Sequence, residues 1–170
     1  DDIHSDLVMP GHAYTPLAAL GDDFAANTVT CSSPSKTFNI PGAGCAFVVI
    51  PDAEKRAAFR RAGRRTSALD LPNIFSVTAA EAAYREGGEW HEALLAYLRE
   101  SRDELEAFVA AELPRVRMTH IEATYLAWLG VDGLGLPDAA AACRSAGVEL
   151  SAGAAFGDPA YLRLNFGCRR

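Results

Sequence analysis

Apolar residues recur with a helical period through the middle of the chain. Residues 53–64 predict a helix, and Asp52 in front of them is a good N-cap because its carboxylate can accept backbone hydrogen bonds. Residues 89–113 predict the longest helix, in which the apolar stripe consists of Trp90, Leu94, Tyr97, Leu98, Leu105, Phe108 and Val109. Such a helix spans about 37 Å, so it can leave one domain and begin another.

Two shorter helices are expected on either side of the long one. Thr78 and Glu81 have the spacing of a capping box, which predicts a helix that ends at Gly87-Gly88. Another helix is predicted over residues 137–146. Residues 66–75 have no period and contain a proline, so they are predicted to form a loop.

Strand patterns flank these helices. A continuous apolar run at residues 45–50 predicts a strand buried on both faces, as in a parallel sheet. The last predicted strand, residues 161–166, alternates polar and apolar positions, so Arg163 and Asn165 share one face. Shorter strands are predicted at residues 28–31, 116–118, 125–129 and 148–150. A small α+β unit therefore follows the long helix.

Composition and charge limit the classes of protein to which this chain can belong. The chain has 170 residues, a net charge of -6, and 49% hydrophobic and 22% charged residues, which is typical of a soluble globular protein with one or two domains. This charge argues against nucleic-acid and membrane-surface partners, and no apolar run is long enough for a membrane span. The four cysteines form no C-x-x-C pair and are expected to be reduced, which indicates a cytoplasmic protein. Both ends are expected to be cuts through a larger protein.

Lys36 is the main candidate for chemistry. The chain has 14 arginines but only two lysines, and Lys36 lies between small hydroxyl residues and an apolar run in Ser33-Pro34-Ser35-Lys36-Thr37-Phe38. An amine kept from water has a lowered pKa and can react with carbonyl compounds. Taken alone, the pattern also fits an ordinary surface lysine.

Other motifs carry less weight. Ser33-x-x-Lys36 matches the S-x-x-K of penicillin-binding enzymes, but the S-D-N and K-T-G motifs are missing. Asp1, His4 and His12 provide too little for a metal site, so no metal is predicted. The arginines of residues 53–65 are interpreted as a solvated helix face, because no aromatic residues alternate with them in the manner of a nucleic-acid site.

Several segments together resemble one enzyme superfamily. A strand end that reads Asp-x-x-His is followed about thirty residues later by S-x-S-K, and by an arginine-bearing strand 127 residues after Lys36. This order resembles the fold-type I pyridoxal 5'-phosphate (PLP) enzymes of the aminotransferase superfamily. Five sequence segments are similar to those of the cystathionine β-lyase/MalY–PatB group of C–S lyases. They are DDIHSDLVMPGH, SPSKTFN, EAAYREGGEWHEALLAYLRE, TYLAWL and RLNFGC. The resemblance covers essentially the whole chain and corresponds to the second half of such a protein.

The resemblance implies a fold and an assembly. It predicts an α/β, PLP-transferase-like fold. Residues 1–88 would form the end of a large cofactor domain with a mixed, mostly parallel sheet, and residues 89–170 a small α+β domain. It also implies a homodimer, with the loop 66–75 as the segment that reaches the partner subunit.

The resemblance also assigns roles to individual residues. Lys36 would be the Schiff-base lysine, and Asp1 would pair with the pyridinium nitrogen of PLP. His4 would lie near the ring hydroxyl, and Ser33 and Ser35 would donate hydrogen bonds to the phosphate. Arg163 would bind the α-carboxylate of an amino-acid substrate.

The chain departs from the pattern at two positions. Relatives usually carry a basic residue eight positions after the lysine, where this chain has Gly44, and often a glycine where it has Ala123. The upstream half, which would carry the glycine-rich phosphate cup and the aromatic residue that stacks on PLP, lies outside these 170 residues. The chain alone is therefore not expected to form a complete active site.

The implied function is PLP-dependent β-elimination on cystathionine or an S-substituted cysteine. The products would be a thiol or persulfide, pyruvate and ammonia. An aminotransferase would use the same residues, and a C–S lyase domain of a natural-product assembly line is a third reading. A non-catalytic binding module is the alternative from another class, and retention of Asp1, Lys36 and Arg163 argues against it.

Overall fold

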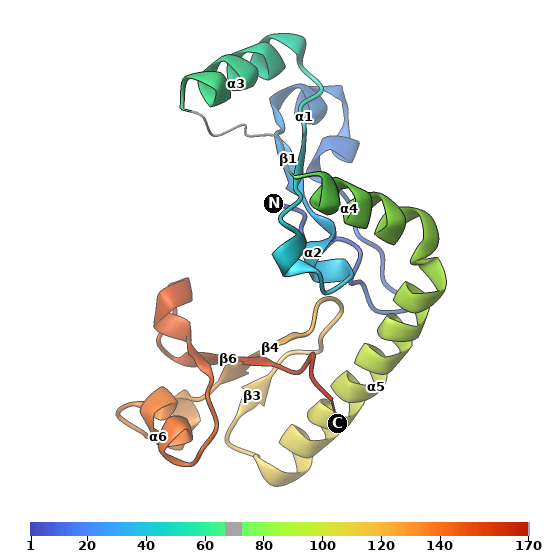
Figure 1. Cartoon of the computed structure of the whole chain (residues 1–170). Helices are drawn as coiled ribbons and strands as arrows, with labels where there is room; N and C mark the ends of the chain where they lie inside the picture. Colours follow the sequence, from blue (N-terminus) through green and yellow to red (C-terminus); the bar gives the residue numbers. More distant parts are fainter. Residues whose placement is uncertain (67–72, 170) are drawn as a thin grey trace. The chain divides into compact units, whose positions relative to one another are not determined.

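The computed structural model describes residues 1–66 and 73–169 as two compact units (Figure 1). Unit 1 comprises Asp1–Val8 and Ala13–Ala93, and unit 2 comprises Met9–His12 and Leu94–Arg170. The change from one unit to the other falls inside the longest helix. The assignment of residues 1–88 to a cofactor domain and of 89–170 to a small domain stays a prediction. Residues 67–72 of the predicted loop 66–75 lie outside the described residues, and the loop prediction is wrong for Ile74 and Phe75, which belong to a helix.

Unit 1 consists of short elements and two longer helices. In chain order its elements are η1 (Leu17–Leu20), α1 (Asp22–Asn27), β1 (Thr30–Ser32), α2 (Pro34–Thr37), η2 (Pro41–Ala43), β2 (Phe47–Val49), α3 (Ala53–Arg65), α4 (Ile74–Glu86) and the start of α5 (Gly88–Glu112). The helix predicted after Asp52 is confirmed, because the Asp52 side chain accepts a 2.7 Å hydrogen bond from the Lys55 backbone N–H.

The capping box predicted at Thr78 and Glu81 is wrong. Helix α4 begins five residues earlier, at Ile74, with Asn73 as the N-cap that accepts a hydrogen bond from the Ser76 backbone N–H. Thr78 lies inside the helix and donates its hydroxyl to the Ile74 carbonyl. The predicted end of the helix at Gly87 is confirmed.

Strand β2 differs from the buried parallel strand that its apolar run predicts. It pairs with β1 in an antiparallel, two-stranded sheet, with Cys31 opposite Val48. All three of its residues are exposed. Phe47 contacts Tyr84 of α4, with ring centroids 6.3 Å apart, but no described element covers the strand enough to bury it. The sequence pattern identifies the strand correctly and its surroundings wrongly.

Unit 2 contains an antiparallel sheet with strand order β3-β4-β6-β5. After α5 its elements are β3 (Arg117–Met118), β4 (Leu126–Gly130), η3 (Asp132–Leu134), α6 (Ala139–Ser145), β5 (Ser151–Ala152), η4 (Gly153–Phe156) and β6 (Tyr161–Asn165). The predicted long helix is confirmed as the 25-residue α5. The strand predicted at 148–150 forms slightly later, as β5. The buried core includes Leu98, Val109, Ala127, Leu129 and Leu162.

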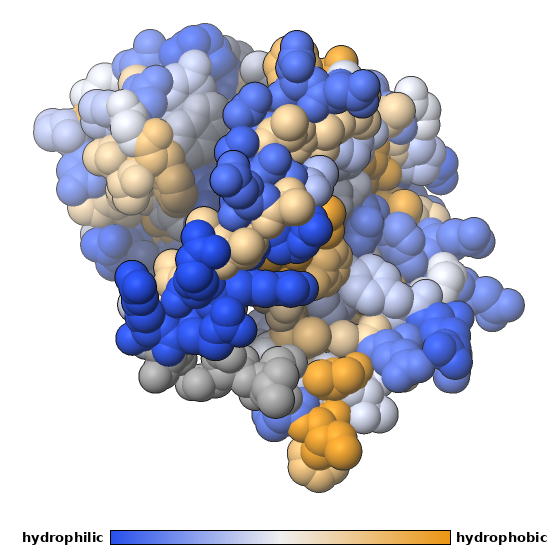
Figure 2. Space-filling view, turned by 90° about the horizontal axis from the view of Figure 1, so that it is seen from above, coloured by the Kyte–Doolittle hydropathy of each residue, from blue (hydrophilic) through white to orange (hydrophobic). Residues whose placement is uncertain are grey.

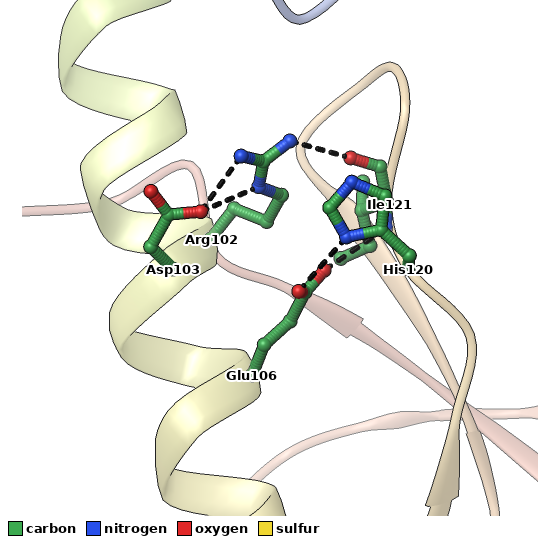
Figure 3. Close-up of polar contacts among 5 residues, drawn as sticks. All are labelled: Arg102, Asp103, Glu106, His120 and Ile121. Atoms are coloured by element: carbon green, nitrogen blue, oxygen red, sulfur yellow. Dashed lines mark hydrogen bonds and ion pairs between the residues drawn. The ribbon is translucent and has the colours of Figure 1, made fainter.

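Two polar side chains of α5 fix the segment that leads into β4 (Figure 3). The buried Arg102 donates one hydrogen bond to the Ile121 carbonyl at 3.0 Å and two more to Asp103. Glu106 accepts a hydrogen bond from the Ile121 backbone N–H at 3.0 Å and lies 2.9 Å from His120 Nδ1. A buried guanidinium needs such partners, because an unpaired buried charge is costly.

The surface mixes polar and apolar residues (Figure 2). Some large apolar side chains are strongly exposed; Ile74 and Phe75, at the start of α4, are 74% and 82% exposed. In the described part of the chain, no helix has both the length and the apolar character that a membrane crossing requires.

Candidate active site

The lysine turn is held in a fixed shape by Ser33. Ser33 is the N-cap of α2, and its Oγ accepts a 3.1 Å hydrogen bond from the Ser35 backbone N–H. The same hydroxyl lies 2.6 Å from the Cys45 carbonyl and 2.9 Å from Ser35 Oγ, and it has a single proton to donate. Ser33 is buried, whereas Ser35 is half-buried. Ser35 is therefore the better placed of the two to donate to a ligand.

Lys36, in the third position of α2, is exposed. Among the described residues its amine makes no hydrogen bond or ion pair, and the side chain lacks the burial expected from the sequence. Its neighbour Thr37 is 1% exposed. The turn thus buries Thr37 and presents the amine outward, where a ligand can reach it.

The segment that carries Asp1 and His4 is attached to this turn by hydrogen bonds. The Asp2 backbone N–H donates to the Cys31 carbonyl at 2.8 Å, and Thr37 Oγ1 donates to Asp6 Oδ2 at 2.9 Å. These contacts bring Asp1 and His4 into the same part of unit 1 as Lys36. Sequence reasoning missed Asp6 and Thr37, because nothing in the local pattern indicates a contact between residues 31 positions apart.

The two predicted ligands on this segment differ in exposure. Asp1 is exposed, and its carboxylate accepts a 3.2 Å hydrogen bond from the Ile3 backbone N–H. His4 is half-buried. The carboxylate predicted to face the ring nitrogen is therefore accessible in unit 1.

Helix α5 supports the same segment from its first turn. His91 Nε2 lies 2.7 Å from the Asp6 carbonyl, so residue 6 is held through both its side chain and its backbone. Phe38 lies beside Tyr84, His91 and Trp90, with ring centroids 5.5–6.2 Å apart. Aromatic packing thus joins the end of the lysine turn to α4 and α5.

Two phenols of unit 1 titrate at higher pH than ordinary tyrosines. A hydrogen bond with the Asp2 carboxylate raises the pKa of Tyr14. Burial raises the pKa of Tyr84, and the nearby Asp6 and Cys45 add to this effect. Both phenols therefore keep their protons near neutral pH and act there as hydrogen-bonding groups rather than as anions.

Gly44 stands where relatives usually carry a basic residue, and its backbone conformation favours glycine. Its φ is +50°, in the left-handed region, where it ends η2. Side chains of L residues rarely adopt this conformation, and glycine adopts it without strain. A basic residue at this position would therefore cost more backbone strain than glycine does.

Arg163 lies in the middle of β6, in unit 2. It is half-buried and stands opposite Trp128 of β4 and Ser151 of β5. Its carbon Cζ lies 4.3 Å from the centroid of the Phe156 ring, and its Nη2 lies 3.5 Å from Ser151 Oγ. The predicted sharing of one face by Arg163 and Asn165 agrees with the strand register.

The described residues offer specific chemistry. Unit 1 presents a primary amine, a carboxylate and a serine hydroxyl; unit 2 presents a guanidinium. No group of histidine, cysteine and acidic residues suited to a metal ion occurs among residues 1–66 and 73–169. All four cysteines are free thiols.

The sequence matches known proteins over its whole length. The model of the family described as aminotransferase class I and II matches residues 1–170. Cystathionine beta-lyase PatB of Bacillus subtilis is 45% identical over 173 residues, which cover 99% of this chain and 44% of that protein. The chain thus spans less than half the length of this relative.

Solved structures are similar as well. The PLP-bound putative aminotransferase from Clostridium difficile superposes with a TM-score of 0.93 at 34% identity, over 99% of this chain and 44% of that one. Cystalysin from Treponema denticola, which contains PLP, superposes with a TM-score of 0.90 at 27% identity, over 98% and 43% of the two chains. These matches confirm the predicted α/β, PLP-transferase-like fold and the resemblance stated from the motifs. The chain belongs to the aminotransferase class I and II family.

Proposed function

We propose that a protein containing this chain is a PLP-dependent C–S lyase that acts on cystathionine or another S-substituted cysteine. The observation that carries the proposal is the exposed Lys36 amine, held on a turn fixed by Ser33 and Thr37 in a chain of this family. Its relatives include proteins named cystathionine β-lyase, and a structural neighbour is named a PLP-bound C–S lyase.

The donor groups of unit 1 fit PLP. A primary amine suits the aldehyde of the cofactor, a carboxylate suits its pyridinium nitrogen, and hydroxyl donors suit its phosphate. Lys36, Asp1 and Ser35 would supply these groups, and His4 would lie near the ring hydroxyl. Ser33 would act mainly by shaping the turn. When bound, PLP withdraws electrons from the substrate α-carbon, which makes the α-proton acidic.

The side chains of this chain would then handle the proton and the carboxylate. Exchange with the substrate amine would release Lys36 from the cofactor, and the freed amine would then take the α-proton onto Nζ. The electrons of the Cα–H bond form the new Cα–Cβ double bond as the sulfur leaves with the C–S bonding pair. Protonated Lys36 can return its proton to that thiolate. Addition of water to the unsaturated product then yields pyruvate and ammonia. Arg163 would bind the substrate α-carboxylate with two parallel N–H donors.

The assembly and location remain part of the proposal. A homodimer is supported by the strong exposure of Ile74 and Phe75, the last two residues of the segment predicted to reach a partner subunit. A cytoplasmic location is supported by the four free thiols, because a reducing compartment keeps them so. Light scattering of the full-length protein, compared with its Phe75→Asp variant, tests the dimer.

The experiment that tests the function uses the full-length protein and no keto acid. Incubation with cystathionine or S-methyl-L-cysteine should release thiol and pyruvate over many turnovers. A single turnover that stalls until a keto acid is added would establish an aminotransferase instead. Borohydride reduction and peptide mapping should place the cofactor on Lys36, and Lys36→Ala should lose both the label and the activity. Label on Lys55 instead would overturn the assignment.

A further inference from the structure

Arg163 stands at one end of a continuous row of stacked side chains on one face of the sheet in unit 2. Its guanidinium lies over the Phe156 ring, with Cζ 4.3 Å from the centroid. Phe156 meets Trp128 edge-on, with centroids 5.9 Å apart and the rings at 82°. The Trp128 ring stacks on the Tyr161 ring, with centroids 5.1 Å apart and 7° between the planes, and Arg117 Cζ lies 5.4 Å from the centroid of the Tyr161 ring.

The strand register puts these residues on the same face. Tyr161 and Arg163 are two positions apart on β6, and Trp128 of β4 stands directly opposite Arg163. The opposite face carries Ala127 and Leu162, which are 0% and 3% exposed and belong to the core. The row is therefore supported from below by a packed sheet, so that its residues have little freedom to shift.

Phe156 reaches Arg163 from outside the sheet, at the end of the η4 turn. Gly153 begins this turn against the backbone carbonyls of Asp158 and Tyr161, so closely that no Cβ would fit. Gly157, with a φ of +93°, ends it. The backbone thus fixes the place of Phe156 from both sides, although the ring itself is 49% exposed.

An aromatic ring and a carboxylate hold a guanidinium in different ways. The ring attracts the cation through its face but has no acceptor atom, so it occupies no N–H donor and cancels no charge. In unit 2, Arg117, Arg144 and Arg102 are instead held by the carboxylates of Asp132, Glu149 and Asp103 at 2.6–2.9 Å. Among the described residues of the same unit, Arg163 has no carboxylate partner.

We infer that Phe156 is a positioning residue for Arg163: it holds the guanidinium in place by its ring face and leaves the charge and the N–H donors available for a substrate carboxylate. Ser151 Oγ accepts a long hydrogen bond of 3.5 Å from Arg163 Nη2, at one end of the guanidinium. The inference rests on the proposed role of Arg163 in carboxylate binding. It adds a residue that acts on substrate binding through the arginine.

The test uses two substitutions at Phe156 in the full-length holoenzyme. Phe156→Leu removes the ring but keeps an apolar side chain, and Phe156→Tyr keeps the ring. Phe108→Leu is the matched control, because Phe108 is an exposed aromatic residue on α5 in the same unit.

Loss of a cation–π contact predicts that Phe156→Leu raises KM for S-methyl-L-cysteine by about 5- to 30-fold. The value of kcat should change by less than about twofold, because the contact is the same in ground and transition states. Phe156→Tyr should restore most of the affinity.

A substrate analogue without the carboxylate separates positioning from general damage. Binding of 2-(methylthio)ethylamine, followed by the change in cofactor absorbance, should be equal in the wild-type protein and in Phe156→Leu. In an Arg163→Ala background, Phe156→Leu should have no further effect on amino-acid binding. Equal weakening of the amine and the amino acid, or additive effects in the double variant, would overturn the inference.

An NMR readout keeps the inference independent of the proposed activity. The Arg163 Nε–H resonance should show the ring-current shift of a group above an aromatic face. That shift should disappear in Phe156→Leu and persist in Phe156→Tyr and Phe108→Leu. An unchanged Arg163 resonance in Phe156→Leu would overturn the inference even if the enzyme is a lyase. A protein that shows the shift but forms no pyruvate would instead contradict the proposed function.

Discussion

The hydroxyl of Thr37 donates a 2.9 Å hydrogen bond to the Asp6 carboxylate, and this bond joins the lysine turn to the segment that carries Asp1 and His4. Thr37 is 1% exposed, so its hydroxyl has no access to water. The residue beside the candidate reactive amine therefore has a structural task. It fixes the backbone from which Lys36 projects.

Replacement of Thr37 should remove the hydrogen bond that joins these two segments. Thr37→Val keeps the shape of the side chain and removes the hydroxyl, so Asp6 loses a donor in a part-buried place. We expect a loss of about 1–2 kcal/mol in the free energy of unfolding, and near-complete recovery in Thr37→Ser. Urea denaturation measures both, and Thr66→Val, at the exposed end of α3, is the control. Equal stability of the valine and threonine forms would show that the bond contributes nothing.

Removal of Arg163 should affect the substrate and spare the cofactor. Arg163→Ala in the full-length protein should weaken amino-acid binding by about 2–5 kcal/mol if the ion pair with the substrate is desolvated. The visible spectrum of bound PLP should stay unchanged. Arg163→Lys keeps the charge but not the planar pair of donors, so it should recover only part of the affinity.

The control for Arg163 is another arginine of the same unit. Arg144→Ala removes an exposed guanidinium that pairs with Glu149, and it should leave substrate binding unaffected. Binding titrations of both variants with S-methyl-L-cysteine give the comparison. If Arg163→Ala binds the amino acid as well as the wild-type protein does, the residue has only a structural role.

Acid should weaken the ion pair between Arg117 and Asp132, at the end of the row of stacked side chains opposite Arg163. The hydrogen bond from Arg117 lowers the pKa of Asp132 below its ordinary value of 3.8. A lowered folded-state pKa means that the pair stabilises the fold fully above the unfolded value and ceases to do so as the pH falls through the folded one. The stability difference between the wild-type protein and Asp132→Asn should therefore be constant from pH 7 to about 5 and shrink below pH 4.

Carboxyl NMR measures the same shift directly. In Arg117→Gln the Asp132 carboxyl should titrate closer to 3.8. Both groups are exposed, so high salt should reduce the difference between the two proteins. An Asp132 pKa that does not respond to Arg117→Gln would show that the ion pair has no effect in solution.

The η4 turn should not tolerate a methyl group at Gly153. The added Cβ of Gly153→Ala would meet the carbonyl oxygens of Asp158 and Tyr161, and backbone atoms cannot move aside cheaply. We expect a loss of stability of about 1–3 kcal/mol from overpacking. Because Phe156 ends the same turn, the KM for the amino acid should rise as well. Gly88→Ala is the control, since its Cβ would meet no atom within 4 Å.

The sequence predicts the long helices of this chain well, because their signals are local. Asp52 caps α3 as its side-chain chemistry requires, and the apolar stripe of α5 recurs over 25 residues. Prediction of the start of α4 fails because two capping sequences compete: Thr78 lies inside the helix, and Asn73 is the actual cap. Burial of β2 is mispredicted because an apolar run indicates a strand but not which layers cover it.

The sequence also predicts some parts of the candidate site and misses others. Lys36 and Arg163 stand out because a rare lysine and an alternating strand can be recognised in the sequence. The contacts that hold them, Thr37 with Asp6 and Phe156 with Arg163, join residues that no periodicity relates. Such contacts depend on how the turns fold, so only the three-dimensional structure shows them.

The exposed strand β2 has a practical consequence for handling the 170-residue chain. Phe47, Val48 and Val49 present apolar side chains along a strand that has one hydrogen-bonded neighbour, β1. An open, apolar strand edge is a template for pairing with other chains. Concentrated solutions of the 170-residue chain should therefore form β-rich aggregates, and a lysine at position 48 should delay them by repulsion between edges.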